Sequence, residues 1–214
     1  MFRGLRQRDK ILIRKTGSEI IATIDSNNNY YEQSLFSFGL EKNTPYELKI
    51  ILAILNSAFA NFLLKENAFS KKETFPQIRL HWLKEFPIPE ISKETQQFTI
   101  EKADKLLMLN EKIQENKTKF LNRITDNFDL VKVNKKLAGF YEFDFKTFVK
   151  ELKKQKIKLT LVQQDEWEEY FNAYKNQINQ LQDEINTTDK EIDQMVYKLY
   201  ELTEEEITII EKSI

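Results

Sequence analysis

The sequence has no cysteine, and its 214 residues include only one histidine, four glycines and four prolines. Without cysteine there is neither a disulfide framework nor a thiolate metal site, and His81 alone excludes the usual multi-histidine zinc and iron sites. Four glycines cannot build a glycine-rich phosphate loop. The same scarcity of glycine and proline predicts long, uninterrupted secondary-structure elements.

Long hydrophobic runs are missing as well. No segment reaches the roughly 20 apolar residues that cross a bilayer, and the N-terminal residues lack the apolar core of a signal peptide. We therefore expect a cytoplasmic protein that does not interact with a membrane.

Catalytic motifs are also absent. The sequence contains no Gly-x-Ser-x-Gly, no His-Glu-x-x-His and no Asn/Asp-Pro-Pro-Tyr loop of the kind with which adenine methyltransferases hold a flipped base. The fragments nearest to a nuclease cluster, Asp9-Lys10 and Glu19 to Asp25, lack the required spacing of carboxylates and lysine. We predict a binding module with no catalytic residue and no metal site.

Charge is distributed unevenly along the chain. Residues 1–92 hold 13 Lys and Arg against 10 Asp and Glu (+3), residues 93–164 hold 16 against 10 (+6), and residues 165–214 hold 4 against 14 (−10). The first sixteen residues carry six basic side chains against one acid: Arg3, Arg6, Arg8, Lys10, Arg14 and Lys15 against Asp9. This asymmetry indicates that one end meets a polyanion, and the alternative is that these are simply solvated faces.

The N-terminal part of the chain has the pattern of a small α/β domain. Residues 10–16 and 20–24 predict a β-hairpin, and residues 30–40 a third strand. A helix is predicted from a Thr44–Glu47 capping box through an apolar stretch to Leu63. A short helix is expected at 80–86, and Pro87-Ile88-Pro89 marks the end of this part.

The C-terminal part predicts long helices. One covers about residues 95–124, and a connector over 128–160 contains a short helix with Phe145 and Phe148. A longer helix is expected to be capped by Asp165 with Glu168. It carries a heptad of Trp167, Phe171, Tyr174, Ile178, Leu181, Ile185, Thr188, Ile192, Met195, Leu199 and Leu202. This spacing predicts a coiled-coil seam, with either the helix at 95–124 or a second copy of the chain as partner.

These patterns predict an α+β fold. Residues 1–91 would form a small α/β domain, and residues 92–214 a long antiparallel, coiled-coil-like helical region ending in a short helix capped by Thr203 and Glu206.

Candidate contacts to nucleic acid lie in the first 92 residues. Arginine can bind guanine edges and asparagine adenine edges, whereas lysine most often anchors phosphates. The candidates are Arg14, Lys15, Asn28, Tyr30, Lys71, Lys72 and Arg79. A solvated surface role is the alternative for each of them, and phosphate anchoring is favoured over base reading.

Five segments and the C-terminal run together resemble a known family. The segments are Lys10–Gly17, Ile21–Asp25, Leu52–Ser57, Phe75–Arg79, Leu83–Pro89 and, near the end, Glu191–Glu206. In this order they resemble the TaqI-like C-terminal specificity domain of adenine-specific DNA methyltransferases and of fused type IIG restriction–methylation enzymes.

The resemblance implies recognition of double-stranded DNA by the α/β part, with the helices as a spacer. It also implies an upstream methyltransferase domain that binds S-adenosylmethionine, with a Mg²⁺-dependent nuclease in some members, so that this chain needs no cofactor of its own. The chain would be a C-terminal fragment or a separate specificity subunit, with the methyltransferase domain or subunit as partner. The alternative is a coiled-coil protein-interaction module without DNA affinity of its own.

Overall fold

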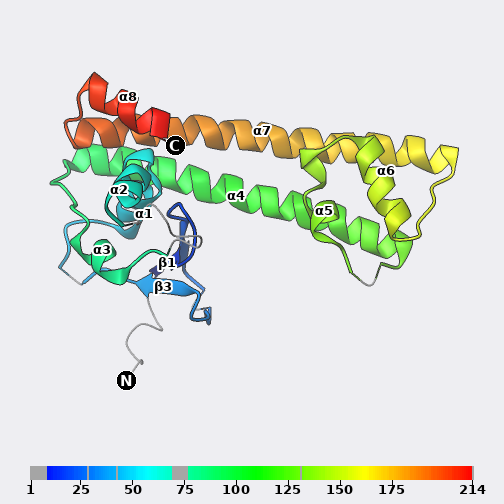
Figure 1. The fold of residues 1–214 in the computed structure, drawn as a ribbon, viewed down its shortest axis with the longest axis horizontal. Coiled ribbons are helices and arrows are strands. Elements are labelled where there is room, and N and C mark those ends of the chain that lie inside the picture. Colours follow the sequence, from blue (N-terminus) through cyan, green and yellow to red (C-terminus); the bar gives the residue numbers. More distant parts are fainter. Residues whose placement is uncertain (1–8, 28, 42, 69–76, 131, 214) are drawn as a thin grey trace. The chain divides into compact units, whose positions relative to one another are not determined.

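The structure, a computed structural model, describes residues 9–27, 29–41, 43–68, 77–130 and 132–213. Its small antiparallel sheet and long helices confirm the α+β fold class (Figure 1). The chain divides into two compact units. We call residues 1–105 with 188–214 the sheet unit, and residues 106–187 the helical unit. The domain boundary placed at residues 91 and 92 remains a prediction.

The sheet has three strands in the order β2-β1-β3, and both pairings are antiparallel. The strands are β1 (Lys10–Arg14), β2 (Ala22–Asp25) and β3 (Leu35–Phe38). The predicted hairpin and third strand are therefore confirmed. Asp25 lies opposite Lys10, whereas Leu35 lies opposite Arg14. The connection from β2 to β3 consequently begins at one end of β1 and finishes at the other.

The apolar stretch after the sheet forms two helices instead of the single one predicted. They are α1 (Leu48–Asn56) and α2 (Ala58–Ala68), which meet at an angle of 61°. Ser57 has extended backbone, and its Oγ accepts a hydrogen bond from the N–H of Ala60, so it ends one helix and caps the next.

The predicted capping box at Thr44–Glu47 is also wrong. Helix α1 begins only at Leu48, and its N-cap Glu47 makes no side-chain capping bond. The neighbouring Tyr46 instead donates its hydroxyl to the carbonyl of Pro89, at 2.9 Å. This contact ties the segment to the proline linker.

Helix α1 covers one face of the sheet and forms the core of the sheet unit with it. Ile11 and Ile13 of β1, and Ile50 and Ile54 of α1, are completely buried. Alternation in a strand sends Lys10 and Leu12 to the opposite face. The short helix α3 (Leu80–Glu85) forms as predicted.

Two long helices, α4 (Lys93–Phe128) and α7 (Leu161–Leu199), contribute to both units. In the sheet unit, Thr99 of α4 contacts Met195 of α7, and Lys102 forms an ion pair with Glu191. Helix α8 (Glu204–Ser213) starts with the predicted reciprocal bonds between Thr203 and Glu206.

The helical unit is built around aromatic side chains. Besides α4 and α7 it contains α5 (Lys135–Ala138), the 3₁₀ turn η1 (Phe140–Glu142) and α6 (Phe145–Lys154). Phe120 of α4 is completely buried and stacks on Phe140 at 3.8 Å between ring centres. It also contacts five further aromatic rings, those of Phe148, Trp167, Tyr170, Phe171 and Tyr174.

Helix α7 starts four residues before the predicted cap at Asp165. Thr160 and Gln163 form the capping box, in which each side chain accepts from the other's backbone N–H, at 3.0 and 3.3 Å. Asp165 therefore lies inside the helix. Five residues of the predicted heptad are buried, namely Phe171, Ile178, Ile185, Thr188 and Ile192. In each unit this seam contacts α4: Phe171 contacts Phe120 in the helical unit, and Met195 contacts Thr99 in the sheet unit.

A carboxylate of α7, Asp193, lies at the start of α2. Asp193 accepts a hydrogen bond from the backbone N–H of Ala58, at 2.7 Å, and so binds the positive end of that helix. Asp189 precedes Asp193 by one turn. Desolvation, together with the charge of Asp193, raises the pKa of Asp189 to about 6.

This raised pKa predicts a pH dependence of the stability of the sheet unit. In the folded state Asp189 takes up its proton at higher pH than in the unfolded chain, so the folded state binds more protons between pH ~4 and ~6. Stability therefore falls as pH rises through this window. We expect Asp189→Asn to stabilise at pH 7 by on the order of 1 kcal/mol, since solvent screens this exposed side chain. Urea titrations at pH 4.5 and 7 measure the effect, and a variant with unchanged stability at both values would contradict it.

Candidate nucleic-acid interface

Three of the predicted DNA-contacting residues lie together at one end of the sheet. Arg14 closes β1 and Lys15 follows it. The carbonyl of Lys15 accepts a hydrogen bond from the N–H of Ile78 at 2.8 Å, and Thr16 pairs with Gln77 in an antiparallel bridge. This pairing brings Arg79 beside the end of β1. We call Arg14, Lys15 and Arg79 the basic strand end.

The members of the basic strand end differ in how they are held. Arg14 is exposed and its guanidinium packs over Gly17, where an added Cβ would come within 2.5 Å of Nη2. Gly17 also has φ +138°, a conformation that side chains rarely adopt. Lys15 is half-buried, with Nζ 4.7 Å from the centre of the Phe36 ring. Arg14 and Arg79 are thus the more exposed cations of the three.

The opposite end of β1 is organised by a buried ion pair. Lys10 Nζ lies 2.5 Å from Asp25 Oδ2, and the two side chains are only about 5% exposed. Asp25 also accepts hydrogen bonds from the backbone N–H groups of Asn27 and Asn29, each at 3.0 Å. The hydrogen bond from Lys10 lowers the pKa of Asp25, although burial opposes it. One carboxylate therefore fixes both the strand pairing and the start of the β2–β3 connection.

The aromatic side chains of this connection lie near that end. Tyr31 is half exposed, with Lys10 Nζ 5.9 Å from its ring centre, and the neighbouring Tyr30 is 87% exposed. The four steps of β1 separate this end from the basic strand end by about 14 Å. Tyr30 is thus on the surface, but the strand separates its part of the chain from Arg14.

The helix α1 motif Leu55-Asn56-Ser57 positions the hairpin. The Asn56 side chain accepts from the N–H of Ala22 at 2.9 Å and donates to its carbonyl at 3.1 Å. Asn61 of α2 accepts from the N–H of Ile20 at 2.7 Å. Two amides thereby hold the β2 segment against the helices.

The other predicted contact residues, Asn28, Lys71 and Lys72, lie outside the described residues, as do Arg3, Arg6 and Arg8 of the basic N-terminal stretch. DNA contact stays a prediction for all seven candidates. Lys10 is a basic residue of the N-terminal stretch whose charge is used internally, because it pairs with Asp25.

Sequence reasoning missed the ion pair and the asparagine contacts. The asparagine contacts did have a signal in the sequence. Asn56 and Asn61 are polar residues in an otherwise apolar helical stretch, and a buried polar group needs a hydrogen-bond partner. The spacing between Lys10 and Asp25 gave no such signal, since the pairing depends on the strand register.

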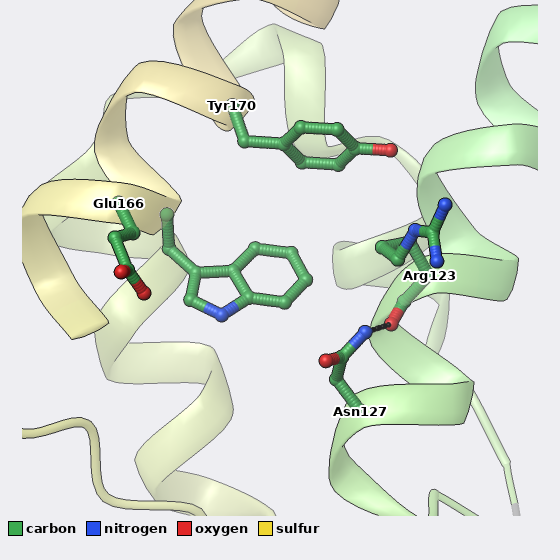
Figure 2. A pocket seen from close by; sticks show the side chains of 5 residues that line it. Arg123, Asn127, Glu166 and Tyr170 are labelled. Carbon is green, nitrogen blue, oxygen red and sulfur yellow. Dashed lines mark hydrogen bonds between the residues drawn. The ribbon is translucent and has the colours of Figure 1, made fainter.

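One open pocket of about 250 Å³ lies in the helical unit. It is lined by Arg123, Asn127, Glu166, Trp167 and Tyr170 (Figure 2). The Asn127 amide donates to the carbonyl of Arg123, at 2.8 Å. The lining combines aromatic rings with opposite charges but contains no nucleophile next to a base.

The residues that the structure describes include no group of three or more His, Cys, Asp or Glu side chains able to hold a metal ion. Nor does any single described helix have the length and composition to cross a membrane. The bent pair α1 and α2 meets these criteria only when taken together, and much of it is buried in the core.

Comparison with known proteins identifies the sheet-containing part. Residues 2–88 match the family described as TaqI-like C-terminal specificity domain, and residues 92–196 match one described as a domain of unknown function (DUF8810). A search of curated proteins gives no significant match. The family resemblance predicted from the sequence is thus confirmed. The match is to a specificity domain and not to a catalytic one, and it supports a role in DNA recognition in restriction–modification enzymes.

Proposed function

We propose that this chain, whose residues 2–88 form a TaqI-like C-terminal specificity domain, selects a short sequence in double-stranded DNA for an adenine-N6 methyltransferase of the type IIG kind. The observation that carries the proposal is the basic strand end within that domain. There Arg14 and Arg79 are exposed, and the N–H···O bond from Ile78 to Lys15 holds their two segments together.

The arrangement suits recognition because hydrogen bonds hold the scaffold in place and the cations are exposed at one end of its central strand. The Asn56 and Asn61 amides fix the hairpin, so the cations project from a defined backbone. Arginine forms paired hydrogen bonds to guanine or to phosphate oxygens. Phosphate contacts set position on the duplex, and contacts to base edges give selectivity.

Catalysis would come from a methyltransferase domain or subunit in the parent enzyme. S-adenosylmethionine, and Mg²⁺ for a nuclease, would bind there, because the described residues offer neither a glycine-rich loop nor a metal-binding cluster. In this proposal the protein acts in the cytoplasm. The competing role as a coiled-coil recruiting module gains no support from the seam, since Phe171, Ile178 and Ile185 are buried within the chain.

The proposal predicts that Arg14→Ala and Arg79→Ala each weaken binding to duplex DNA by on the order of tenfold. Retention of a pool of random-sequence duplexes at 50–200 mM salt measures the change. The matched control is Arg123→Ala, which removes an exposed arginine from the helical unit. Arg14 packs over Gly17, so thermal melting must confirm that the variant is folded. Unchanged retention in both variants of the sheet unit would contradict the proposal.

A further inference from the structure

Among the described residues, the segment with the greatest excess of positive charge is in the helical unit, not in residues 2–88. Residues 132–158 contain nine lysines, all exposed, against the three acids Glu142, Asp144 and Glu151. The nine are Lys132, Lys135, Lys136, Lys146, Lys150, Lys153, Lys154, Lys156 and Lys158. The net charge of this segment, which holds α5 and α6, is +6. We call these nine residues the lysine surface.

Internal ion pairs use only a small part of this charge. Glu151 is buried and lies 2.7 Å from Lys154 and 3.6 Å from Lys136. Asp144 caps α6 by accepting from the N–H of Thr147, at 2.8 Å. For the other seven lysines, the described residues provide no carboxylate within 4 Å.

Other lysines of the same unit are engaged differently. Lys117 donates to the hydroxyl of Tyr141 at 3.2 Å, and Lys175 donates to the carbonyl of Phe143 at 2.6 Å. These two support the internal packing of α4 and α7. The nine residues of the lysine surface, in contrast, are all exposed, and their positive charges outnumber the nearby carboxylates. The excess like charges repel one another.

Helix α6 arranges three of these lysines in a row. Its buried residues are Phe148, Val149, Leu152 and the ion-paired Glu151. Lys146, Lys150 and Lys153 follow at steps of four and three and therefore share the exposed face. Seven residues of helix span about 10 Å. The aromatic contacts of Phe145 and Phe148 with Phe171 fix this face against the core of the unit.

We propose that the lysine surface, through Lys146, Lys150 and Lys153, binds the phosphate backbone of duplex DNA independently of sequence. The helical region would then be a second DNA-binding element and not only a spacer. Lysine suits this task because its ammonium is a flexible point charge that contacts phosphates without reading bases. The inference rests on the proposed function, since it assigns a second site for the same DNA.

The test compares two triple variants of the full chain with the same change in charge. One is Lys146→Gln/Lys150→Gln/Lys153→Gln. The control is Lys190→Gln/Lys198→Gln/Lys212→Gln, three exposed lysines in the acidic C-terminal stretch. Affinity is measured from 50 to 300 mM salt for two 30-base-pair duplexes, one of random sequence and one carrying a motif selected by the wild-type chain.

For the α6 triple variant we expect the slope of log affinity against log salt to fall by about 2.7, which is 0.9 for each lost phosphate contact. At 0.1 M salt, relative to 1 M where this contribution vanishes, the loss is about 500-fold. The loss should be equal for both duplexes, so that the preference for the motif is unchanged. The control should keep the wild-type slope. The single variant Lys150→Gln alters the helix less, and its slope of log affinity against log salt should fall by about 0.9.

Equal slopes for the two triple variants, with motif binding intact, would overturn this inference and leave the proposed function standing. A wild-type chain that binds neither duplex would overturn both. A third outcome is that the wild-type chain self-associates, that the α6 triple variant does not, and that both bind DNA with the same affinity. In that case the lysine surface would bind the acidic segment of a second copy and not DNA.

Discussion

Phe120→Ala is expected to lower the free energy of unfolding of the helical unit by about 4 kcal/mol. Phe120 is completely buried and contacts six other aromatic rings from α6, α7 and η1. Truncation removes these contacts and leaves a cavity that rigid neighbouring rings cannot fill. Among the described residues of the unit, no other side chain contacts as many aromatic rings.

Urea denaturation followed by Trp167 fluorescence measures this loss. Trp167 reports on the right unit because its ring centre is 6.3 Å from that of Phe120, whereas the chain's other tryptophan, Trp82, is in the sheet unit. To remove the contribution of Trp82, both proteins carry Trp82→Phe. Leu161→Ala is the control, since Leu161 is 79% exposed and its truncation should change stability by less than about 0.5 kcal/mol. A loss below 1 kcal/mol for Phe120→Ala would show that the aromatic cluster is not the core of this unit.

Asp25→Asn should destabilise the sheet unit by about 3 kcal/mol, because it leaves the ammonium of Lys10 buried without a counter-charge. The wild-type contribution also has a defined pH dependence. Because the pKa of Asp25 is lower in the folded chain, its stabilisation is complete above the unfolded value of about 3.9 and is lost as pH falls below it. The variant should lack this acid-induced loss, which lies below the window expected for Asp189.

The double variant Lys10→Met/Asp25→Asn separates charge from loop geometry. It removes the buried ammonium, and the amide oxygen introduced at position 25 still accepts from Asn27 or Asn29. We therefore expect it to recover most of the lost stability. Thermal melts of the single and double variants at pH 7 are the measurement. Equal destabilisation in both would mean that the carboxylate acts through the loop and not through Lys10.

Local patterns in the sequence were enough to predict the sheet, the last helix and the family. Two short β-branched runs on either side of Gly17-Ser18 predicted the hairpin, and the Thr203–Glu206 spacing predicted the start of the last helix. The ordered motifs gave the specificity domain that the match over residues 2–88 confirms. Each of these signals lies within a few residues or in an ordered set of short segments.

Two of the three errors lie where a contact from a distant part of the chain is made in place of the local pattern. The Thr44–Glu47 box does not form, and Tyr46 within it instead binds the carbonyl of Pro89. The apolar helix breaks at Ser57, where Asp193 from α7 binds the N–H of Ala58. The start of α7 was misplaced because two capping boxes compete, and Thr160 with Gln163 prevails over Asp165 with Glu168.

The candidate site was predictable in part. Arg14, Lys15 and Arg79 could be named from their chemistry, but their proximity depends on the pairing of residue 16 with residue 77, which no local pattern indicates. The sequence analysis placed all candidate DNA contacts in the first 92 residues. The lysine surface could be defined only from the structure, in which α6 buries Phe148 and Leu152 and exposes its lysines.

The central claim is that this chain reads a DNA sequence, and selection from a pool of random duplexes tests it most directly. The chain is incubated with the pool at 50 and 150 mM salt, and the retained fraction is sequenced. Our account predicts a short common motif of roughly 4–7 base pairs, whose enrichment decreases in the Arg14→Ala variant. Retention without any common motif, equally sensitive to salt in the wild type and in Arg14→Ala, would contradict it.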